Sequence, residues 1–402
     1  MFLTFIRNFS KHSQKEVYII DAIRTPIGIF KGGLSSISAP NLGSLTIKSL
    51  LKRNENLKDL VEEVFIGNVC QAGLGQSPAR QASIGAGINE SVDCTTINKV
   101  CASGMKAIML AAQSIILGYR NVMIAGGMEN MSKVPFYIAR GEIPYGGCKI
   151  QDGIVVDGLT DAYNNIHMGV CGEMLAKKMN ITRKDQDEFA VMSYKRALEA
   201  TKKGVFKDEI VPVNVPQKKG KPDITLIEDE EPKRGDFQKF PNLSPAFEKQ
   251  GTITAANASK INDGACMLLL ANQDHTKNPS KFLAKIIAFA DGALNPVEFT
   301  MAPSIVIPKA LDMAKLKISD IDLWEINEAF SVVALGNIRK LNLDINKVNV
   351  NGGAVSMGHP LGMSGARIVT HLVHALKKGQ KGLAAVCNGG GAASAIIIEK
   401  LV

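Results

Sequence analysis

The feature that most constrains the fold is an alternation of short apolar runs with longer helical patterns. The short runs, which are rich in β-branched residues, lie at 17–20, 64–66, 122–125 and 383–386. Residues 105–117 and 366–376 have the apolar spacing of helices. Strands that alternate with helices are typical of α/β proteins. We therefore predict an α/β fold with a mostly parallel sheet.

One pattern within this alternation occurs twice. Cys101 and His359 each stand three residues before a Gly-Met pair that opens a predicted helix, and segments 57–68 and 318–327 also match weakly. Two duplicated halves would place Cys101 and His359 in equivalent strand-to-helix turns. A thiol and an imidazole would then meet between two helix N-termini. Chance similarity between common α/β patterns is the alternative explanation.

The 402 residues are enough for two or three domains. We predict an N-terminal half at 16–132, completed by 250–275, and a C-terminal half at 280–402. Residues 133–249 are richer in charge, Pro and Gly, which favours a loop domain on the surface. Residues 1–15 are basic and free of acidic residues, which is typical of a short mitochondrial transit peptide. A disordered N-terminal arm is the alternative.

Composition excludes several classes of function. A net charge of +9 favours anionic partners, but six Tyr and one Trp are too few for a surface that stacks single-stranded nucleic acid. No apolar run approaches the roughly 18 residues of a membrane span. The seven cysteines are scattered and never form a CxxC pair, which favours reduced thiols over disulfides or a zinc site. We expect no nucleic acid, no membrane and no zinc.

Cys101 lies where a predicted strand meets a helix. Free amides and the helix dipole favour a thiolate there by about 0.3 to 1 kcal/mol, and such positions lower a thiol pKa below about 8.5. Cys101 is therefore either a nucleophile or a small buried apolar residue.

His359, between a Gly and a Pro in a rigid turn, is predicted to be functional. His371 and His374 lack a metalloprotease pattern and are predicted to lie on a helix surface.

Cys387 ends a buried strand and precedes a run of glycines, whose amides could meet a developing oxyanion. The run has neither a P-loop pattern nor the dinucleotide fingerprint, so no NAD is expected. Asn327 ends another strand and could hold a substrate oxygen or water, or simply cap the next helix. Two thiols, one His and one Asn suggest acyl transfer through a thioester, followed by proton abstraction next to a carbonyl.

The sequence resembles the thiolases, and within them the mitochondrial acetoacetyl-CoA members, from about residue 17 to residue 401. The resemblance is carried by motifs at 98–106, 327–330, 352–367 and 387–391. It implies a five-layered αβαβα fold of two similar halves, with the loop domain covering coenzyme A. It also implies an acetyl-CoA C-acetyltransferase that interconverts two acetyl-CoA with acetoacetyl-CoA and CoA. A homotetramer in the mitochondrial matrix is the implied state, with the cytoplasm as the alternative location.

The resemblance implies a role for each catalytic group. Cys101 would carry the acetyl group, Cys387 would take and return the α-proton, and His359 would activate Cys101 and donate to an oxyanion. Asn327 would hold a water in the first oxyanion hole, and the amides of Cys101 and Gly389 would form the second.

The resemblance also implies two sets of ligand contacts. The coenzyme A contacts would be Tyr194, Arg234, Gly235, Asp236, Lys239 and Ser259, with His167 near the pantetheine arm. Potassium, as an activator, would be held by the Tyr194 side chain and the backbone carbonyls of Ala255, Ala256, Ala258 and Val355.

Two departures from the family pattern stand out. Ala392-Ala393 follows the glycine run where relatives continue it, and Phe299-Thr300 replaces a Phe-Pro pair found in members that accept a 2-methyl branch. We therefore expect poor use of branched substrates.

A decarboxylating ketoacyl synthase is the rival enzyme, and the second thiol argues against it. A non-catalytic acyl-CoA carrier would have lost a reactive group, and none is missing.

Overall fold

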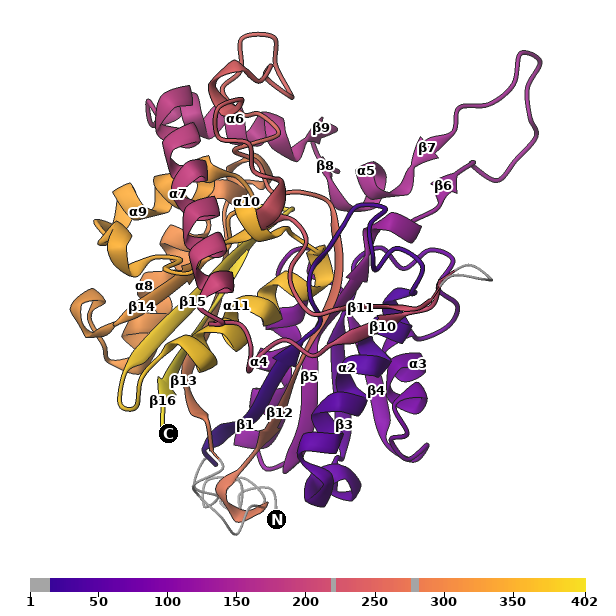
Figure 1. Ribbon diagram of the computed structural model, residues 1–402, viewed down its shortest axis with the longest axis vertical. Coiled ribbons are helices and arrows are strands. Elements are labelled where there is room, and N and C mark those ends of the chain that lie inside the picture. Colours follow the sequence, from indigo (N-terminus) through magenta and orange to yellow (C-terminus); the bar gives the residue numbers. More distant parts are fainter. Residues whose placement is uncertain (1–14, 218–221, 276–281) are drawn as a thin grey trace, which may run out of the picture.

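The computed structural model describes residues 15–217, 222–275 and 282–402 (Figure 1). The first half contributes the strands β1 (Val17–Arg24), β2 (Gly28–Ile29), β3 (Glu63–Gly67), β4 (Asp93–Ile97), β5 (Val122–Asn130) and β12 (Asn262–Ala271). The second half contributes β13 (Ala284–Ala293), β14 (Leu323–Ile326), β15 (Lys381–Asn388) and β16 (Ala392–Lys400). The predicted transit peptide lies outside the described residues except for Lys15.

The main sheet repeats its strand order on either side of a central pair. From one edge the order is β4-β3-β5-β12-β1, and it continues as β13-β16-β15-β14. β1 pairs antiparallel with β13 at the centre. The strands β1, β12, β5 and β3 therefore correspond to β13, β16, β15 and β14, as expected for a duplicated fold. β4 is an additional edge strand of the first half.

The prediction of a mostly parallel sheet is wrong. Among the described strands, β3 is parallel to β4 and β5, and β14 is parallel to β15. However, β12 runs antiparallel to both β1 and β5, and β16 runs antiparallel to both β13 and β15. The sequence pattern missed these pairings because β12 returns after a long excursion and β16 follows a tight glycine turn.

The helices complete five layers. They are α2 (Ala39–Arg53), α3 (Pro78–Gly85), α4 (Ser103–Ile116), α8 (Pro303–Ala314), α9 (Ser331–Leu341) and α11 (Leu361–Ala375). α4 and α11 pack against each other and against strands of both halves, whereas α2 and α3 cover the outer side of the first half and α8 that of the second. The predicted αβαβα arrangement is confirmed. β5 and β12 are buried along their whole length because helices cover both faces.

The N-terminal ends of α4 and α11 touch through glycines. A Cβ atom on Gly104 would lie 2.7 Å from the Gly362 carbonyl oxygen, and one on Gly365 would lie 2.7 Å from the Met105 amide nitrogen. Larger side chains would hold the two helices apart. This contact brings together the turns that precede the helices, which contain Cys101 and His359.

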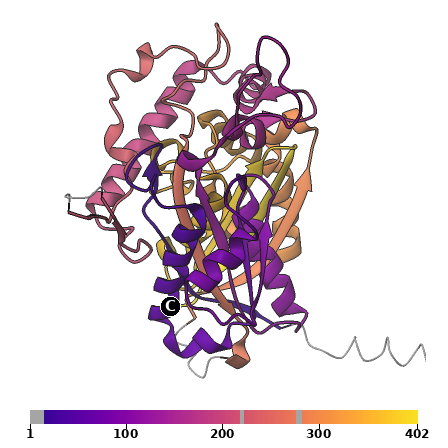
Figure 2. The same ribbon diagram turned by 90° about the vertical axis from the view of Figure 1, so that its right-hand side faces the viewer.

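The chain leaves the sheet after β5 and returns as β12. The excursion contains α5 (Gly153–Gly158), α6 (Met168–Lys178), α7 (Arg183–Lys202) and the short pairs β6 (Phe136–Tyr137) with β7 (Gln151–Asp152), β8 (Thr160–Asp161) with β9 (Ile166–His167), and β10 (Val213–Val215) with β11 (Ile224–Leu226). α7 packs on α9 and on α10 (Ala354–Met357), so it lies over the second half. The arm that carries β6 and β7 projects from the body (Figures 1 and 2). In the described part of the chain, no helix has the length and apolar character to cross a membrane.

Candidate active site

Cys101 lies in a strained turn between β4 and α4, as predicted. Val100, just before it, has a left-handed φ of 47°, which β-branched residues rarely adopt. The Val100 amide donates to Asn98 Oδ1 at 3.0 Å, and Ser103 Oγ donates to the Val100 carbonyl at 2.6 Å. These bonds hold the turn and leave Cys101 buried at the start of α4, with 8% of the residue exposed.

The electrostatics of Cys101 differ from the prediction of a lowered thiol pKa. Burial raises the pKa to about 12, although the backbone amides of Gly389 and of Cys101 itself donate hydrogen bonds that favour the thiolate. Loss of hydration therefore outweighs the two amides. The convergence of these amides is what the implied second oxyanion hole requires.

Cys387 lies opposite this turn, near the end of β15. It is fully buried, and burial together with the neighbouring Cys101 raises its thiol pKa. The glycine turn that follows requires glycine at Gly391, which has a φ of 86° and no room for a Cβ beside the Leu294 carbonyl. Ala393 simply continues β16, where it pairs with Cys387 in the ladder.

The His359 ring is fixed from one side. Ser364 Oγ donates to the Pro360 carbonyl at 2.8 Å, so His359 Nδ1 is the donor in its 2.6 Å bond to Ser364 Oγ. His359 Nε2 is then free to accept a proton, and Asn327 Nδ2 lies 3.5 Å from it. Burial, helped by Arg367, lowers the pKa of His359 to about 3, so the imidazole is neutral.

Asn327 follows β14 and is buried beside His359. Its Oδ1 atom has no hydrogen-bond partner among the described residues. A buried, unpaired amide oxygen is costly unless a water or ligand group meets it. This favours a site for water or substrate over the alternative of a helix cap, since Phe330 occupies the cap position of α9.

Sequence reasoning missed three residues that position the site. Asn262 Oδ1 accepts from the His359 amide at 3.0 Å, and Glu129 accepts from the Gly362 amide at 2.8 Å. Asp291 accepts from Lys106 Nζ at 2.7 Å and pairs with Lys99 Nζ. These bonds outweigh burial and hold the pKa of Asp291 at about 2.

The sequence contains one sign that Glu129 has a special position. It is an acidic residue within the apolar run 122–130, which becomes a fully buried strand. Its carboxylate also accepts from Asn68 Nδ2 at 2.8 Å and from the amides of Val69 at 3.0 Å and Cys70 at 3.2 Å. Nevertheless, burial raises its pKa to about 7.

The residues implied for coenzyme A gather at a single cavity of about 500 Å³. Its lining includes Tyr194, Arg234, Asp236, Lys239 and Ser259. Gly235 packs against the Tyr194 ring, from which a Cβ would be only 2.7 Å away. Arg234 and Lys239 are exposed cations, paired with Glu231 at 3.6 Å and Asp236 at 2.8 Å.

His167 is not among the residues that line that cavity and lies at the N-terminus of α6. Its Nδ1 caps α6 by accepting from the Gly169 amide at 3.0 Å, and its ring stacks on Phe247 at 4.8 Å. The next residue, Met168, lies beside Gly389, where a Cβ would be 3.6 Å from its sulfur.

The oxygens implied for potassium are engaged differently. Lys260 Nζ donates to the carbonyls of Ala258 at 2.8 Å, Val355 at 2.9 Å and Ala256 at 3.4 Å. The Tyr194 ring centroid lies 5.2 Å from the same nitrogen. Burial lowers the pKa of Lys260 to about 8, opposed by Glu231 and Glu328. Within residues 15–217, 222–275 and 282–402, no cluster of three His, Cys, Asp or Glu could hold a metal.

The prediction that His371 lies on a helix surface is wrong. Its ring is buried, with Nδ1 2.9 Å from Glu209 Oε2 and Nε2 3.0 Å from Asn351 Nδ2. The Glu209 carboxylate outweighs burial and raises the pKa of His371. The reason is that α11 is a central helix, covered on all sides. His374 is half-buried, with Nε2 bonded to the Ala22 carbonyl at 2.7 Å.

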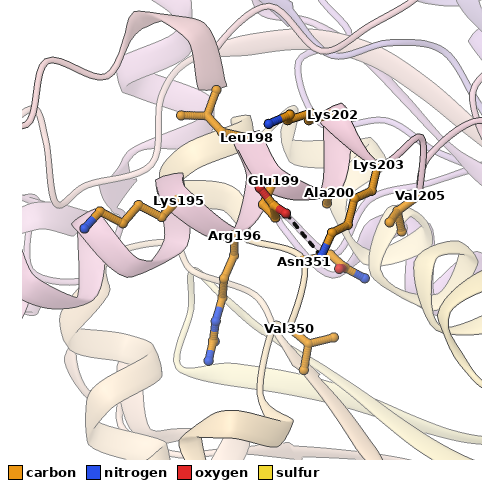
Figure 3. Close-up of a pocket in the computed structure, with 10 residues that line it drawn as sticks. All are labelled: Lys195, Arg196, Leu198, Glu199, Ala200, Lys202, Lys203, Val205, Val350 and Asn351. Atoms are coloured by element: carbon orange, nitrogen blue, oxygen red, sulfur yellow. Dashed lines mark ion pairs between the residues drawn. The ribbon is translucent and has the colours of Figure 1, made fainter.

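A cavity of about 630 Å³ lies between the end of α7 and Val350-Asn351 (Figure 3). Its rim carries four basic side chains, and Figure 3 shows the ion pair of Glu199 with Lys203 at 3.1 Å. None of the predicted site residues lines it.

The comparisons with known proteins agree with this arrangement. The family models described as "Thiolase, N-terminal domain" and "Thiolase, C-terminal domain" match residues 17–274 and 280–400. The chain is 57% identical to a mitochondrial acetyl-CoA acetyltransferase of Xenopus laevis over 98% of this chain and 94% of that protein. It is 56% identical to a mitochondrial acetyl-CoA acetyltransferase of Bos taurus over 98% of this chain and 93% of that protein. A thiolase of Ascaris suum, solved in complex with coenzyme A, superposes with a TM-score of 0.92 at 49% identity, over 96% of this chain and all of that one.

Proposed function

The chain belongs to the thiolase family, and from that premise we propose how its residues carry out the family's chemistry. It is an acyltransferase, an acetyl-CoA acetyltransferase that interconverts two acetyl-CoA with acetoacetyl-CoA and free coenzyme A. The observation that carries the proposed site is the pair of buried thiols with two backbone amides on the first. Such a site holds one acyl group and keeps a second acid/base group beside it.

In the first step, Cys101 attacks the carbonyl carbon of acetyl-CoA. Its proton passes to His359 Nε2, which the Ser364 bond leaves available. The thioester bond to coenzyme A breaks as the bond to Cys101 Sγ forms, and Cys387 gives its proton to the departing coenzyme A thiolate. The amides of Cys101 and Gly389 stabilise the oxyanion of this step.

In the second step, the Cys387 thiolate removes an α-proton from another acetyl-CoA. The resulting carbanion attacks the acetyl carbonyl on Cys101, and the bond to Cys101 Sγ breaks to give acetoacetyl-CoA. His359 then returns its proton to the Cys101 thiolate, so both cysteines end as thiols. The protonated His359 and a water held by Asn327 stabilise the enolate oxygen of the second substrate.

Coenzyme A occupies the cavity lined by Tyr194 in this proposal. The exposed Arg234 and Lys239 suit its phosphates, and His167 borders the path to the thiols. The cavity wall reaches the catalytic turns directly, because the Lys260 carbonyl accepts from the His359 amide at 3.3 Å and the Ser259 amide donates to Ala329 at 3.1 Å.

Potassium does not fit the carbonyls implied for it. Three of the five oxygens already accept from the Lys260 ammonium group. A second unit charge 4 Å from that group would be repelled by about 4 kcal/mol at an effective dielectric constant of about 20. No catalytic step is therefore assigned to potassium.

We also propose a homotetramer. The projecting arm exposes five large apolar side chains, which are Phe136, Ile138, Ile143, Tyr145 and Ile150. Contiguous exposed apolar surface marks protein interfaces. Light scattering should give a tetramer for the natural chain and a smaller species when Ile138 and Ile143 are both replaced by Ser. A monomer for the natural chain would contradict the proposal.

The protein acts in the mitochondrial matrix, since its curated relatives are named as mitochondrial. We propose that residues 1–15 direct import. Fusion of residues 1–20 to a fluorescent reporter tests whether they suffice. Unchanged mitochondrial location after deletion of residues 1–15 would exclude that role.

The function is tested by thiolysis with the purified protein. Acetoacetyl-CoA plus coenzyme A should give two acetyl-CoA, whereas longer 3-ketoacyl-CoA and 2-methylacetoacetyl-CoA should react more slowly. If a long-chain 3-ketoacyl-CoA were cleaved faster than acetoacetyl-CoA, the proposed short-chain substrate class would be wrong.

A further inference from the structure

Lys260 has surroundings that are unusual for a lysine. Its ammonium group faces three backbone carbonyls, of Ala256, Ala258 and Val355. An ammonium group has three donors and no acceptor, and all three partners are acceptors with no proton to give. The Tyr194 ring and the carboxylates of Glu231 and Glu328 add further attraction for a positive charge.

These contacts tie together three parts of the site. Ala256 belongs to the wall of the coenzyme A cavity, Val355 belongs to α10, and the Lys260 carbonyl accepts from the His359 amide at 3.3 Å. Without a cation, the gathered carbonyl dipoles would repel one another. The positive charge therefore holds both the cavity wall and the turn that presents His359.

We propose that Lys260 is an internal cation that takes the place of a bound monovalent ion, so that the enzyme works equally well with or without potassium. The proposal rests on the proposed function, since the cavity and His359 are parts of that site. Lys260 is a positioning residue in this scheme and does not touch the reacting atoms. An alkali ion would need the same carbonyl oxygens that the ammonium group occupies.

The test removes the side chain and offers free cations instead. Lys260→Ala leaves space at the carbonyls, whereas Lys260→Met removes the charge but keeps most of the volume. Each protein is compared in choline, sodium, potassium and ammonium chloride at one ionic strength. Two quantities are measured, which are the Tm without substrate and the rate of acetoacetyl-CoA thiolysis. Lys378→Ala, at an exposed lysine, is the matched control.

We expect the natural protein and the control to show the same Tm and rate in all four salts. Lys260→Ala should lose activity and regain it, by about fivefold or more, in potassium or ammonium, which is the lower end of typical coupling between two sites. Its Tm should rise with the same ions by mass action. Lys260→Met should lose activity without recovery, because its side chain still fills the space.

Two results would overturn the proposal. One is stimulation of the natural protein by potassium over sodium, which would mean that a separate ion site exists. The other is a Lys260→Ala protein with natural Tm and activity in choline, which would mean that the ammonium group holds nothing in place. If Lys260→Ala shows the cation-dependent Tm while the natural protein fails to cleave acetoacetyl-CoA, the proposed function fails and the internal cation stands.

Discussion

The contact between α4 and α11 gives a sharp prediction, because it sets the distance between the turns of Cys101 and His359. In Gly104→Ala, the new Cβ would lie 2.7 Å from the Gly362 carbonyl oxygen, whereas ordinary contact begins at 3.4 Å. The helices must separate by about 0.7 Å at this point. Overpacking of a core costs about 1–3 kcal/mol, and replacing Gly within a helix returns up to about 1 kcal/mol. We therefore expect a net loss of about 0–3 kcal/mol in the free energy of unfolding.

The larger effect should be on the chemistry. A misplacement of about 1 Å between reacting groups can lower a rate 100-fold, so we expect acetylation of Cys101 to slow by about 10- to 100-fold. Rapid mixing with acetyl-CoA followed by mass spectrometry measures that rate, and urea unfolding measures the stability.

The control is Gly336→Ala in α9. Its Cβ would meet the mobile ends of Leu175 at 3.1 Å and Met301 at 3.2 Å, so stability and rate should be kept or improved. Natural acetylation by Gly104→Ala would refute the argument that helix spacing sets the geometry of the site.

Three further predictions concern the site. Cys101→Ala should form no acetyl-enzyme, whereas Cys387→Ala should acetylate slowly and not condense; an acetyl group on Cys387 of the natural protein, seen by mass spectrometry, would reverse the two roles. Glu129→Gln should lower the free energy of unfolding, measured in urea, by about 2–6 kcal/mol. The new amide nitrogen would face two buried N–H groups and leave both unpaired, at a cost of about 1–3 kcal/mol each. A loss below about 1 kcal/mol would argue against a charged Glu129. Burial holds the pKa of His359 at about 3, below its ordinary value, so between these values the unfolded chain binds a proton that the folded chain does not. The free energy of unfolding therefore falls as the pH drops below about 6.5, by about 2 kcal/mol at pH 5. His359→Asn should remove this pH-dependent loss.

The sequence predicted that Cys101 and His359 lie just before helices, because this signal is local. The prediction of a strand before each turn is wrong for His359, which follows α10. Cys101 and His359 stand at the same distance from a Gly-Met pair, and the glycines of those pairs are where the helices touch. By contrast, the direction of β12 depends on its partners β1 and β5, which are far away along the chain. A pattern of alternating elements carries no information about such pairings.

Burial was the second property that the sequence did not reveal. Amides at the start of α4 were expected to favour a Cys101 thiolate. The amides that do so are those of Gly389 and of Cys101 itself, and burial of the thiol outweighs them and raises its pKa. The same reason explains His371: the apolar spacing predicted its helix, but not that this helix lies at the centre of the fold, against α4 and strands of both halves. Lys260 was missed because its partner Val355 is far away in sequence and binds it through a backbone carbonyl. Every residue has such a carbonyl, so the residue type gives no signal of the contact.

The shifted pKa values together define the resting state of the site. Burial keeps both cysteines as thiols and His359 as a neutral imidazole, so no charge separation exists before the substrate arrives. In the proposed mechanism, a charge forms on Cys101 only as its proton reaches His359 and the negative charge moves to an oxygen held by the amides of Cys101 and Gly389. In a buried site such fixed donors stabilise charge more strongly than water would. The catalytic power of the site therefore depends on how well the strained turn at Val100, the bond from His359 to Ser364 and the ammonium group of Lys260 hold these donors in place.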